Sequence, residues 1–388
     1  MGSIKSGSGY SLNGGGGGGG TGDVVGPASS TDNAYVIWDG VTGKLIKDSD
    51  IIWTSGTDYA ADPYTGFTAN VANAYLVVGP NGTGAIQAHV ADGTAAGGNT
   101  RGDYAVDLQR RRVNAAQVAS GIYSVVCGGW NNRATGSNST VSGGINNSAT
   151  TFDATAGGGR NNVASGGYST VSGGYTNNAS GTTSSVGGGQ LNVPSALGAC
   201  ISGGRQNGAS GNYSAVGGGL SNSATNLVSS TSGGYFSLAD HYGEFAHGSG
   251  QFAATGDAQY SRMVLRIQTV DATPTELSAD GAAPTGTDRL SLVDNSGYQF
   301  HIQVIARDTS GTDSAWWDIR GCIVRSAGAA TTTLIGTNIV GTSSTAGAAA
   351  WTLTATADTV NGALKVEATG AAATIRWVAT VHSTKVAY

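Results

Sequence analysis

Charged residues are scarce in this sequence. Lys, Arg, Asp and Glu make up 11% of the 388 residues, and the formal net charge is −5. The charged fraction is under half that of an ordinary globular domain. Domains that bind nucleic acids carry a basic surface, which this charge balance does not supply. We therefore expect no nucleic-acid partner.

Cysteine and long apolar runs are also lacking. The three cysteines, Cys127, Cys200 and Cys322, are odd in number and far apart, so they do not form a disulfide framework. We expect them to be free and buried. No run reaches the ~18 apolar residues that a transmembrane helix needs. The N-terminus has no basic region followed by an apolar core, so we expect neither membrane insertion nor a secretory signal.

Motifs of catalysis are missing as well. The carboxylates of the last third of the chain are numerous, but no spacing pairs them as a glycosidase requires. The many Gly-x-Gly strings follow from a repeat and do not indicate a phosphate loop. His241, Glu244 and His247 lie close together in the sequence, but their spacing matches no recognised metal site. The sequence therefore predicts no enzyme, no cofactor and no metal.

Glycine, in contrast, is abundant, with 65 residues, and it is periodic. The second Gly of a small-residue pair recurs every fifteen residues, at Gly129, Gly144, Gly159, Gly174, Gly189, Gly204, Gly219 and Gly234. A small or β-branched residue stands three positions before each Gly, and Asn stands three positions after most of them. Three units show the pattern well: Val141, Gly144 and Asn147; Val171, Gly174 and Asn177; Val216, Gly219 and Asn222.

A short period without slips predicts a solenoid, in which each unit stacks on the next. Fifteen residues are too few for a helical hairpin, and Gly with β-branched residues disfavours helix. The unit fits one coil of a parallel β-roll, with two short strands and two tight turns. We expect the Gly pair to adopt positive φ or a close approach. We expect Asn at the next corner to enter the left-handed region and to stack into an amide ladder.

The coils are thin, and this predicts association. Each coil buries one Val or Ile and one Ala, which stabilises it by about 2–4 kcal/mol. Ordering one residue costs roughly 1–2 kcal/mol, so fifteen residues cost more than this gain. A lone roll is therefore marginal, and we expect a homotrimer.

The repeat resembles the head repeats of trimeric autotransporter adhesins, which are left-handed parallel β-rolls that trimerise. Those repeats are usually one residue shorter and have Ala where Val stands here. From about residue 22 to residue 388 the chain also resembles a bacteriophage tail fibre. The segments that carry this second resemblance are 22–34, 38–46, 77–84, 105–109 and 117–121.

Composition shifts divide the chain into five parts. We expect a Gly-rich flexible tether at 1–21, an N-terminal attachment region with short strands at 22–98, a cap or linker at 99–114, the β-roll at 115–260 and a tip domain at 261–388. Ile51–Trp53 is one of the short strands. In the cap, Arg101-Gly-Asp103 is too short a motif to indicate cell adhesion, and Arg110–Arg112 would blunt the open edge of the first coil.

The tip alternates apolar and polar residues between turn signals, which predicts a β-sandwich of jelly-roll type. The fold class is thus all-β, a trimeric left-handed parallel β-roll with a C-terminal sandwich. The expected strands of the tip are Met263–Val270, Arg289–Val293, Tyr298–Arg307, Ala315–Arg325, Thr332–Val340, Ala350–Ala357, Leu364–Ala368 and Ala373–Val386.

The resemblance implies a virion structural protein, a homotrimeric tail fibre that is assembled in the host cytoplasm. Its N-terminal region would attach to a phage tail or baseplate protein, and its tip would bind a host-surface polysaccharide or protein. Aromatic and loop residues of the tip are the candidate receptor contacts: Tyr298, Trp316, Trp317 and Asp313. Alternatives are a fibre or head decoration that binds no receptor, a bacterial trimeric adhesin, which the absent signal disfavours, and a depolymerase.

Overall fold

The computed structural model describes residues 51–53, 67–69 and 83–388. The chain divides into two units, Met1–Gly79 and Pro80–Tyr388. In the first, β1 (Ile51–Trp53) pairs antiparallel with β2 (Phe67–Ala69), which confirms the strand expected at Ile51–Trp53. The expected tether at 1–21 and most of the attachment region lie outside the described residues.

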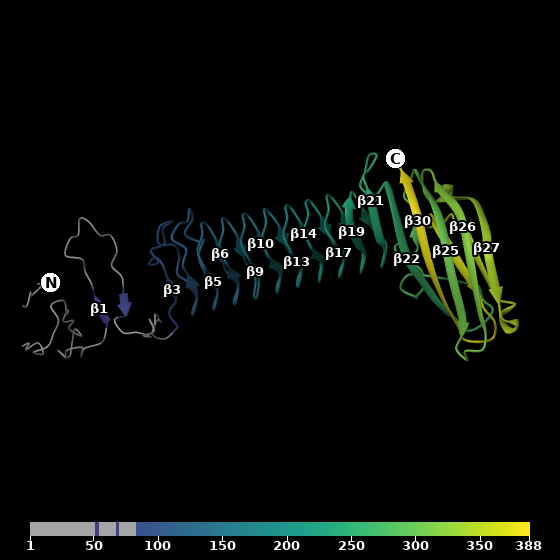
Figure 1. The fold of residues 1–388 in the computed structure, drawn as a ribbon, viewed down its shortest axis with the longest axis horizontal. Coiled ribbons are helices and arrows are strands. Elements are labelled where there is room, and N and C mark those ends of the chain that lie inside the picture. The colour runs from purple at the N-terminus through teal and green to yellow at the C-terminus, as the bar shows by residue number, and fades with distance from the viewer. Residues whose placement is uncertain (1–50, 54–66, 70–82) are drawn as a thin grey trace, which may run out of the picture. The chain divides into compact units, whose positions relative to one another are not determined.

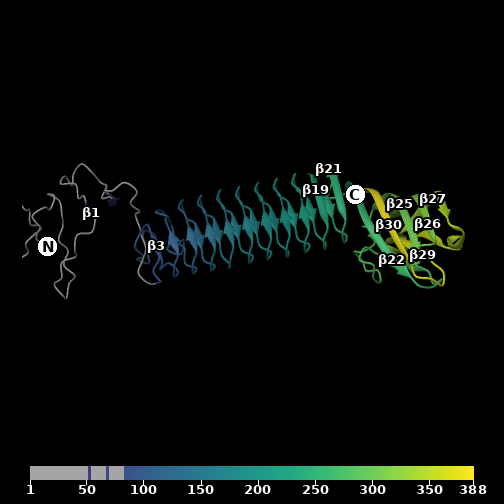
Figure 2. The ribbon, with the colours of Figure 1, turned by 60° about the horizontal axis from the view of Figure 1, so that its bottom comes forward.

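The second unit begins with a stack of parallel coils (Figures 1 and 2). Each coil contributes a short strand to a ladder on one side, and each strand pairs in parallel with the equivalent strand of the next coil. Partners are fifteen residues apart through most of the stack, as with Val126 and Val141 or Val186 and Ile201. The prediction of an all-β parallel solenoid is confirmed.

The ladder consists of eleven strands: β3 (Ile86–Gln87), β4 (Val106–Asp107), β5 (Val125–Val126), β7 (Thr140–Val141), β9 (Thr155–Ala156), β11 (Thr170–Val171), β13 (Ser185–Val186), β15 (Cys200–Ile201), β17 (Ala215–Val216), β19 (Ser230–Tyr235) and β21 (Phe245–Ser249). Two further parallel ladders complete the coils: β6 (Arg133–Ala134), β8 (Ser148–Ala149), β10 (Val163–Ala164) and β12 (Asn178–Ala179), then β14 (Val193–Pro194), β16 (Gly208–Ala209), β18 (Ser223–Ala224) and β20 (Leu238–Ala239).

Two longer coils precede the regular ones. Val106 pairs with Ile86, twenty residues before it, and with Val125, nineteen residues after it. Their interior is polar, because the side chains of Arg101 and Arg112 contact the buried Asp107 carboxylate at 2.8 and 3.6 Å. The guanidinium of Arg111 lies 4.3 Å from the centre of the Trp130 ring in the following coil. The side chain of Arg101 is 1% exposed, so the Arg-Gly-Asp sequence cannot present it to a receptor.

Buried asparagines join the coils. The backbone N–H of Asn147 donates to Oδ1 of Asn132 at 2.9 Å, and Nδ2 of Asn147 donates to the carbonyls of Gly143 and Gly159 at 2.8 and 3.0 Å. The same three bonds recur at the next repeat positions, as at Asn177 and Asn222. The asparagines stack coil on coil as expected, but their side chains bond mainly to backbone groups. Nδ2 of Asn207, which donates to Oδ1 of Asn192 at 3.2 Å, makes a direct amide-to-amide bond.

The left-handed corner residue was also misplaced by one position. It is the residue before the buried Asn, such as Asn146 with φ 56° or Asn161 with φ 57°. The buried Asn instead points inward beside Val141 and Ala149, which are both 0% exposed. The interior of a coil thus consists of one Ser or Ala, as at Ser139, one mostly β-branched residue, one hydrogen-bonded Asn and one Ala.

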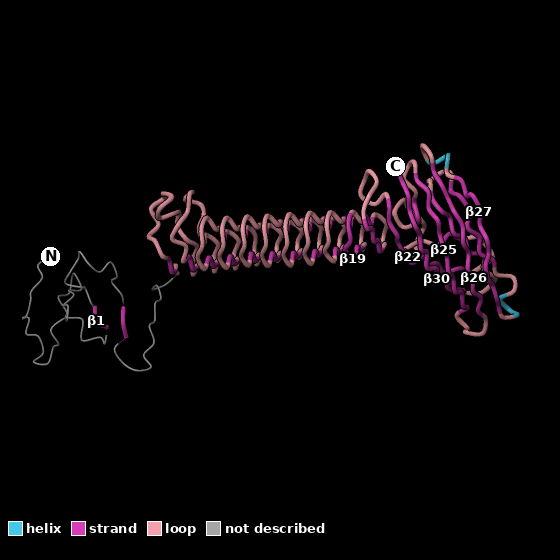
Figure 3. Tube along the Cα trace, turned by 45° about the horizontal axis from the view of Figure 1, so that its top comes forward, coloured by secondary structure: helices cyan, strands magenta, loops and turns pink. Residues whose placement is uncertain are grey.

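The C-terminal part extends the solenoid ladder. The antiparallel strand β22 (Ala258–Thr269) pairs with β21, and the sheet continues through β30 (Ile375–Ala387), β25 (Ser296–Asp308), β26 (Ser314–Arg325) and β27 (Thr333–Ser344) (Figure 1). A smaller antiparallel sheet consists of β23 (Thr275–Glu276), β24 (Leu290–Ser291), β28 (Thr352–Asp358) and β29 (Ala363–Thr369). Two short 3-10 helices, η1 (Ala329–Thr331) and η2 (Ala346–Ala348), flank β27 (Figure 3).

Both sheets of this part contribute to one hydrophobic core, with Phe300 and Trp377 from the larger sheet and Leu364 and Val366 from the smaller one. Strands occur at all eight expected positions, and β23 was not expected. A separate C-terminal sandwich is not confirmed, because the larger sheet is a direct continuation of the solenoid ladder.

Alanine substitutions at two adjacent glycines, Gly173 and Gly174, test the geometry of the coil. Gly174 has φ 96°, and a Cβ there would collide with the carbonyl of Gly189, whereas a Cβ at Gly173 meets nothing within 4 Å. We expect Gly174→Ala to lower the free energy of unfolding by about 2–4 kcal/mol through left-handed strain and overpacking. Gly173→Ala is the matched control and should change stability by no more than about 0.5 kcal/mol. Denaturant unfolding measures both; equal effects of the two substitutions would contradict this geometry.

Candidate functional site

The structure separates the four residues that the sequence suggested for receptor binding. Tyr298 and Trp317 are 3% and 6% exposed and belong to the core, which removes them from the surface of this chain. Trp316 is 43% exposed, because side chains of neighbouring residues in a strand point to opposite faces. Asp313 accepts a hydrogen bond from the Thr345 hydroxyl at 2.6 Å in the turn before β26. Receptor contact stays a prediction for Trp316 and Asp313.

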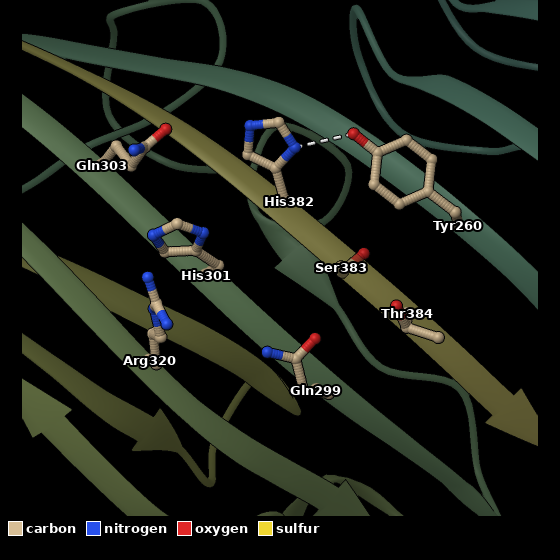
Figure 4. A pocket seen from close by; sticks show the side chains of 8 residues that line it. All are labelled: Tyr260, Gln299, His301, Gln303, Arg320, His382, Ser383 and Thr384. Atoms are coloured by element: carbon tan, nitrogen blue, oxygen red, sulfur yellow. Dashed lines mark hydrogen bonds between the residues drawn. The ribbon is translucent and has the colours of Figure 1, made fainter. Parts of the chain in front are cut away.

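A different set of side chains gathers on the outer face of the larger sheet. An open cavity of about 360 Å³ lies over β22, β30, β25 and β26 (Figure 4). Each residue that lines it carries a polar group; they are Tyr260, Gln299, His301, Gln303, Arg320, His382, Ser383 and Thr384. We call this cavity the outer groove.

Strand register places these residues side by side. His301 lies directly opposite Arg320 on one neighbouring strand and opposite His382 on the other. Gln299, His301 and Gln303 point to the same face because they are two residues apart. Tyr260 and His382 are 122 residues apart in the sequence. Their proximity arises only from the pairing of β22 with β30, so no sequence motif signals this site.

Hydrogen bonds fix several of the side chains. The Tyr260 hydroxyl and Nδ1 of His382 share a hydrogen bond of 2.6 Å. Nε2 of His301 lies 2.9 Å from Oδ1 of Asp318, and Nε of Arg320 lies 3.4 Å from the same oxygen. The rings of His301 and His382 are 6.1 Å apart between centres. The groove therefore presents partly ordered donors and acceptors.

Their surroundings lower the pKa values of two residues at the groove, His382 and Asp318. Burial lowers the pKa of His382 below its usual 6.5, and the positive charges of His301 and Arg262 lower it further. The pKa of Asp318 is also lowered, chiefly by its hydrogen bond with His301 and also by Arg320. Asp318 therefore stays ionised, while His382 resists protonation as long as its cationic neighbours face it.

The layer behind the groove is rigid. Phe300 and Ile302, which alternate with the groove residues of β25, are 0% exposed. The hydroxyls of Ser261 and Ser383 share a buried hydrogen bond of 2.9 Å between β22 and β30. A rigid surface that combines an aromatic ring, amides, hydroxyls and cations is suited to a polyhydroxylated ligand, because it supplies both a stacking face and directional hydrogen bonds.

A second open cavity, of about 460 Å³, lies beside the smaller sheet. Two of its carboxylates contact the same atom, Nη1 of Arg289, with Glu276 at 3.5 Å and Asp358 at 2.8 Å. Burial raises the pKa of Glu276. Burial acts in the same direction on Asp358, but hydrogen bonds from Asn361 and Val360 outweigh it and lower the pKa of Asp358. Two neighbouring carboxyls with opposite pKa shifts can serve as an acid and a base.

Near the end of the solenoid, His241 forms an ion cluster with two carboxylates. Nδ1 of His241 lies 2.8 Å from Asp240 and 2.9 Å from Glu244, and Nε2 lies 3.1 Å from the carbonyl of Ser291. Burial disfavours the imidazolium, but Glu244 and Asp240 outweigh it and raise the pKa of His241 to about 10. Asp240, His241 and Glu244 each offer a ligand atom within 4.8 Å of the others, so the absence of a metal here stays a prediction. His247 lies apart and shares a hydrogen bond with Ser232.

The three cysteines were expected to be free and buried. The cysteines are free, but Cys127 and Cys200 are exposed and Cys322 is half-buried, so the expectation of buried thiols is wrong. Cys127 and Cys200 occupy outward positions of their coils, two and four residues before a repeat glycine.

Within the described part of the chain, no helix is long and apolar enough to span a membrane.

Comparisons with known proteins add only a distant likeness. No family model matches the chain, and no curated protein matches it. Similar solved structures include the tailspike of Acinetobacter baumannii phage AM24, at TM-score 0.20 and 8% identity over 76% of this chain and 68% of that one. The tailspike of Acinetobacter phage vB_ApiP_P1 has TM-score 0.21 and 12% identity over 72% and 53%. The tailspike gp49 of Acinetobacter baumannii bacteriophage Fri1, described as a capsular polysaccharide depolymerase, has TM-score 0.20 and 8% identity over 78% and 72%.

Likeness at these scores is too low to transfer a fold or a function to this chain. The solenoid is established by the strand pairing of the chain itself. The comparison nevertheless contradicts the expectation that the protein is not an enzyme, since gp49 is described as a polysaccharide depolymerase. That expectation is withdrawn.

The lowered pKa of His382 can be tested directly. Its pKa, measured by histidine NMR titration, should lie below 6.5, so that at pH 6.5 less than half of the ring is protonated. Arg262→Gln should raise the pKa of His382, because it removes a repulsive charge from the residue opposite it. Arg376→Gln, six residues away on the same strand and face, is the control and should leave it unchanged. A fall in the pKa of His382 on Arg262→Gln would contradict this account.

Proposed function

We propose that this protein is a phage tail component that binds polysaccharide of the host surface through the outer face of its C-terminal sheet. The repeat, the opening segments and the tip together resemble a tail fibre, and the proposal places the protein in the virion. The N-terminal region would attach to a tail or baseplate protein. The solenoid would act as a rigid spacer.

The observation that carries this proposal is the outer groove. It combines Tyr260, two histidines, an arginine and two glutamines on neighbouring strands above a fully buried layer. Side chains on rigid strands lose little conformational freedom on binding, so weak polar contacts contribute more of their energy to affinity. Trp316 and Ile305, directly opposite one another in β26 and β25 and both exposed, would extend the contact surface along the same face.

We also propose that the fibre is a homotrimer with left-handed coils. Support comes from an exposed apolar ridge along one corner of the solenoid, whose side chains are between 37% and 57% exposed. The ridge consists of Ile122, Tyr123, Phe152, Tyr168, Leu197, Tyr213, Leu227 and Val228. The ridge is interrupted at Ser137–Asn138 and Thr182–Thr183, but apolar side chains exposed along one corner are typical of a protein interaction surface. Avidity among three tips would then multiply weak glycan contacts.

A binding assay tests the main proposal. The full chain, applied to an array of bacterial surface polysaccharides, should bind a subset of them. The double variant H301Q/Q303A should weaken that binding by about tenfold or more, since it removes two groove contacts. The control variant Arg376→Gln lies on the same face outside the groove and should bind normally. Binding that is unaffected by H301Q/Q303A would place the receptor site elsewhere.

Cleavage of the bound glycan is a second candidate function, and the cavity of Glu276 and Asp358 favours it. Both carboxylates contact one nitrogen, so they are closer together than the separation of about 6.5–9.5 Å found in inverting glycosidases. Glu276, with its raised pKa, would protonate the leaving oxygen while Asp358 attacks the anomeric carbon. Water, deprotonated by Glu276, would then hydrolyse the bond to Asp358 and release the sugar. Oε1 of Glu276 is buried and accepts no hydrogen bond from the described residues; its one ionic contact among them is the 3.5 Å approach of Nη1 of Arg289.

Polysaccharide chain length, followed by size-exclusion chromatography, tests this second function. The wild-type chain should shorten the polysaccharide that it binds. Glu276→Gln should slow the cleavage by at least about 100-fold, because it removes the general acid. Glu367→Gln is the matched control, since Glu367 lies directly opposite Glu276 in β29 but does not line the cavity. Equal cleavage by the two variants would rule out this cavity as the active site.

A further inference from the structure

We infer that the outer groove takes an acidic polysaccharide, with a carboxylate or phosphate group of the glycan bound across a row of cationic side chains. This inference rests on the proposed glycan-binding function and adds the substrate class. It goes beyond that proposal because a groove for neutral sugars needs no excess of positive charge.

The row crosses four strands at one level of the sheet. Arg320 on β26 lies opposite His301 on β25, His301 lies opposite His382 on β30, and His382 lies opposite Arg262 on β22. All four side chains point to the outer face, because the residues that alternate with them, such as Ile302 and Met263, are buried. We call these four residues the cationic row.

The surroundings of the row hold little negative charge to balance it. Asp318 is the acidic residue that contacts it, with one oxygen at 2.9 Å from His301 and 3.4 Å from Arg320. The remaining groove side chains are neutral, and Tyr260 contacts His382. With both histidines protonated, four cations therefore face one carboxylate.

Such a row costs stability in the free protein. Like charges directly opposite one another on neighbouring strands repel, and ordinary cross-strand pairs instead combine opposite charges. An anion lying over the row would remove this repulsion and gain charge-assisted hydrogen bonds. The Arg320 side chain is 54% exposed, so its guanidinium can meet a carboxylate or phosphate from solvent.

Because a protonated histidine attracts an anion, the affinity for an acidic glycan should rise as the pH falls. The groups that face the two rings are Asp318, Arg320, Tyr260 and Arg262. A bound anion favours the imidazolium of His382, whose pKa is lowered in the free chain, so binding takes up a proton and strengthens as the pH falls. Arginine and a glycan carboxylate keep their charge between about pH 5 and 8, so they do not produce this dependence. A phosphate monoester changes charge near pH ~6, so the pH test uses the carboxylate probe alone.

Calorimetric titration of the full chain with defined probes tests the inference. The probes are oligogalacturonate and phosphorylated mannan, each beside its neutral counterpart, which is the carboxyl-reduced or dephosphorylated form. We expect at least one acidic probe to bind about tenfold or more tightly than its neutral counterpart. Affinity for oligogalacturonate should rise roughly three- to tenfold from about pH 8 to about pH 5.5. R320Q and R262Q should each weaken binding about tenfold, and R376Q should not.

The pH dependence has its own control, because H301Q/H382Q should abolish it without abolishing binding through the arginines. The inference is overturned if neither acidic probe binds better than its neutral counterpart, or if R376Q weakens binding as much as R320Q. Neutral glycans that bind in the groove and lose affinity in H301Q/Q303A would leave the proposed function standing while removing the acidic substrate class. Failure of the array to show binding to any polysaccharide would instead overturn the proposed function.

Discussion

Hydrogen bonding between neighbouring strands is the constraint on which this structure depends. A single ladder runs without interruption from β3 through the solenoid to β27, and the turn from parallel to antiparallel pairing occurs between β21 and β22. An open parallel edge at the last coil would invite further strands to add. Pairing with β22 closes that edge and at the same time orients β30 and β25. The position of the outer groove is thus set by the end of the solenoid.

Within the coils, the same constraint explains the repeat. A coil this thin has almost no apolar volume, so a buried polar side chain must satisfy the backbone groups that the ladder leaves unpaired. Asn147 does so with three hydrogen bonds, two of which cross to neighbouring coils. The glycine at position 144 lets the next coil approach closely enough for these bonds. A shift of one residue would break both features together, which is why the period does not slip.

Those features of the fold that repeat or alternate along the chain could be predicted from the sequence. The glycine and asparagine periods predicted the solenoid, and apolar alternation predicted the strands of the tip. The two long coils before Val125 were missed because their spacings of twenty and nineteen residues contain no repeated glycine pair. The groove was missed for a different reason. Tyr260, His301 and His382 come from three distant strands, and only the pairing register of the sheet brings them together. Trp317 and Tyr298 looked like ligand contacts, but strand alternation turns them into the core.

The most direct test of this account is a cryo-electron microscopy map of the full chain with a bound acidic oligosaccharide. The account predicts sugar density along the outer face of β22, β30, β25 and β26, with an acidic group over His301 and Arg320. Density on the coils, or an outer face that is covered by another subunit, would contradict it.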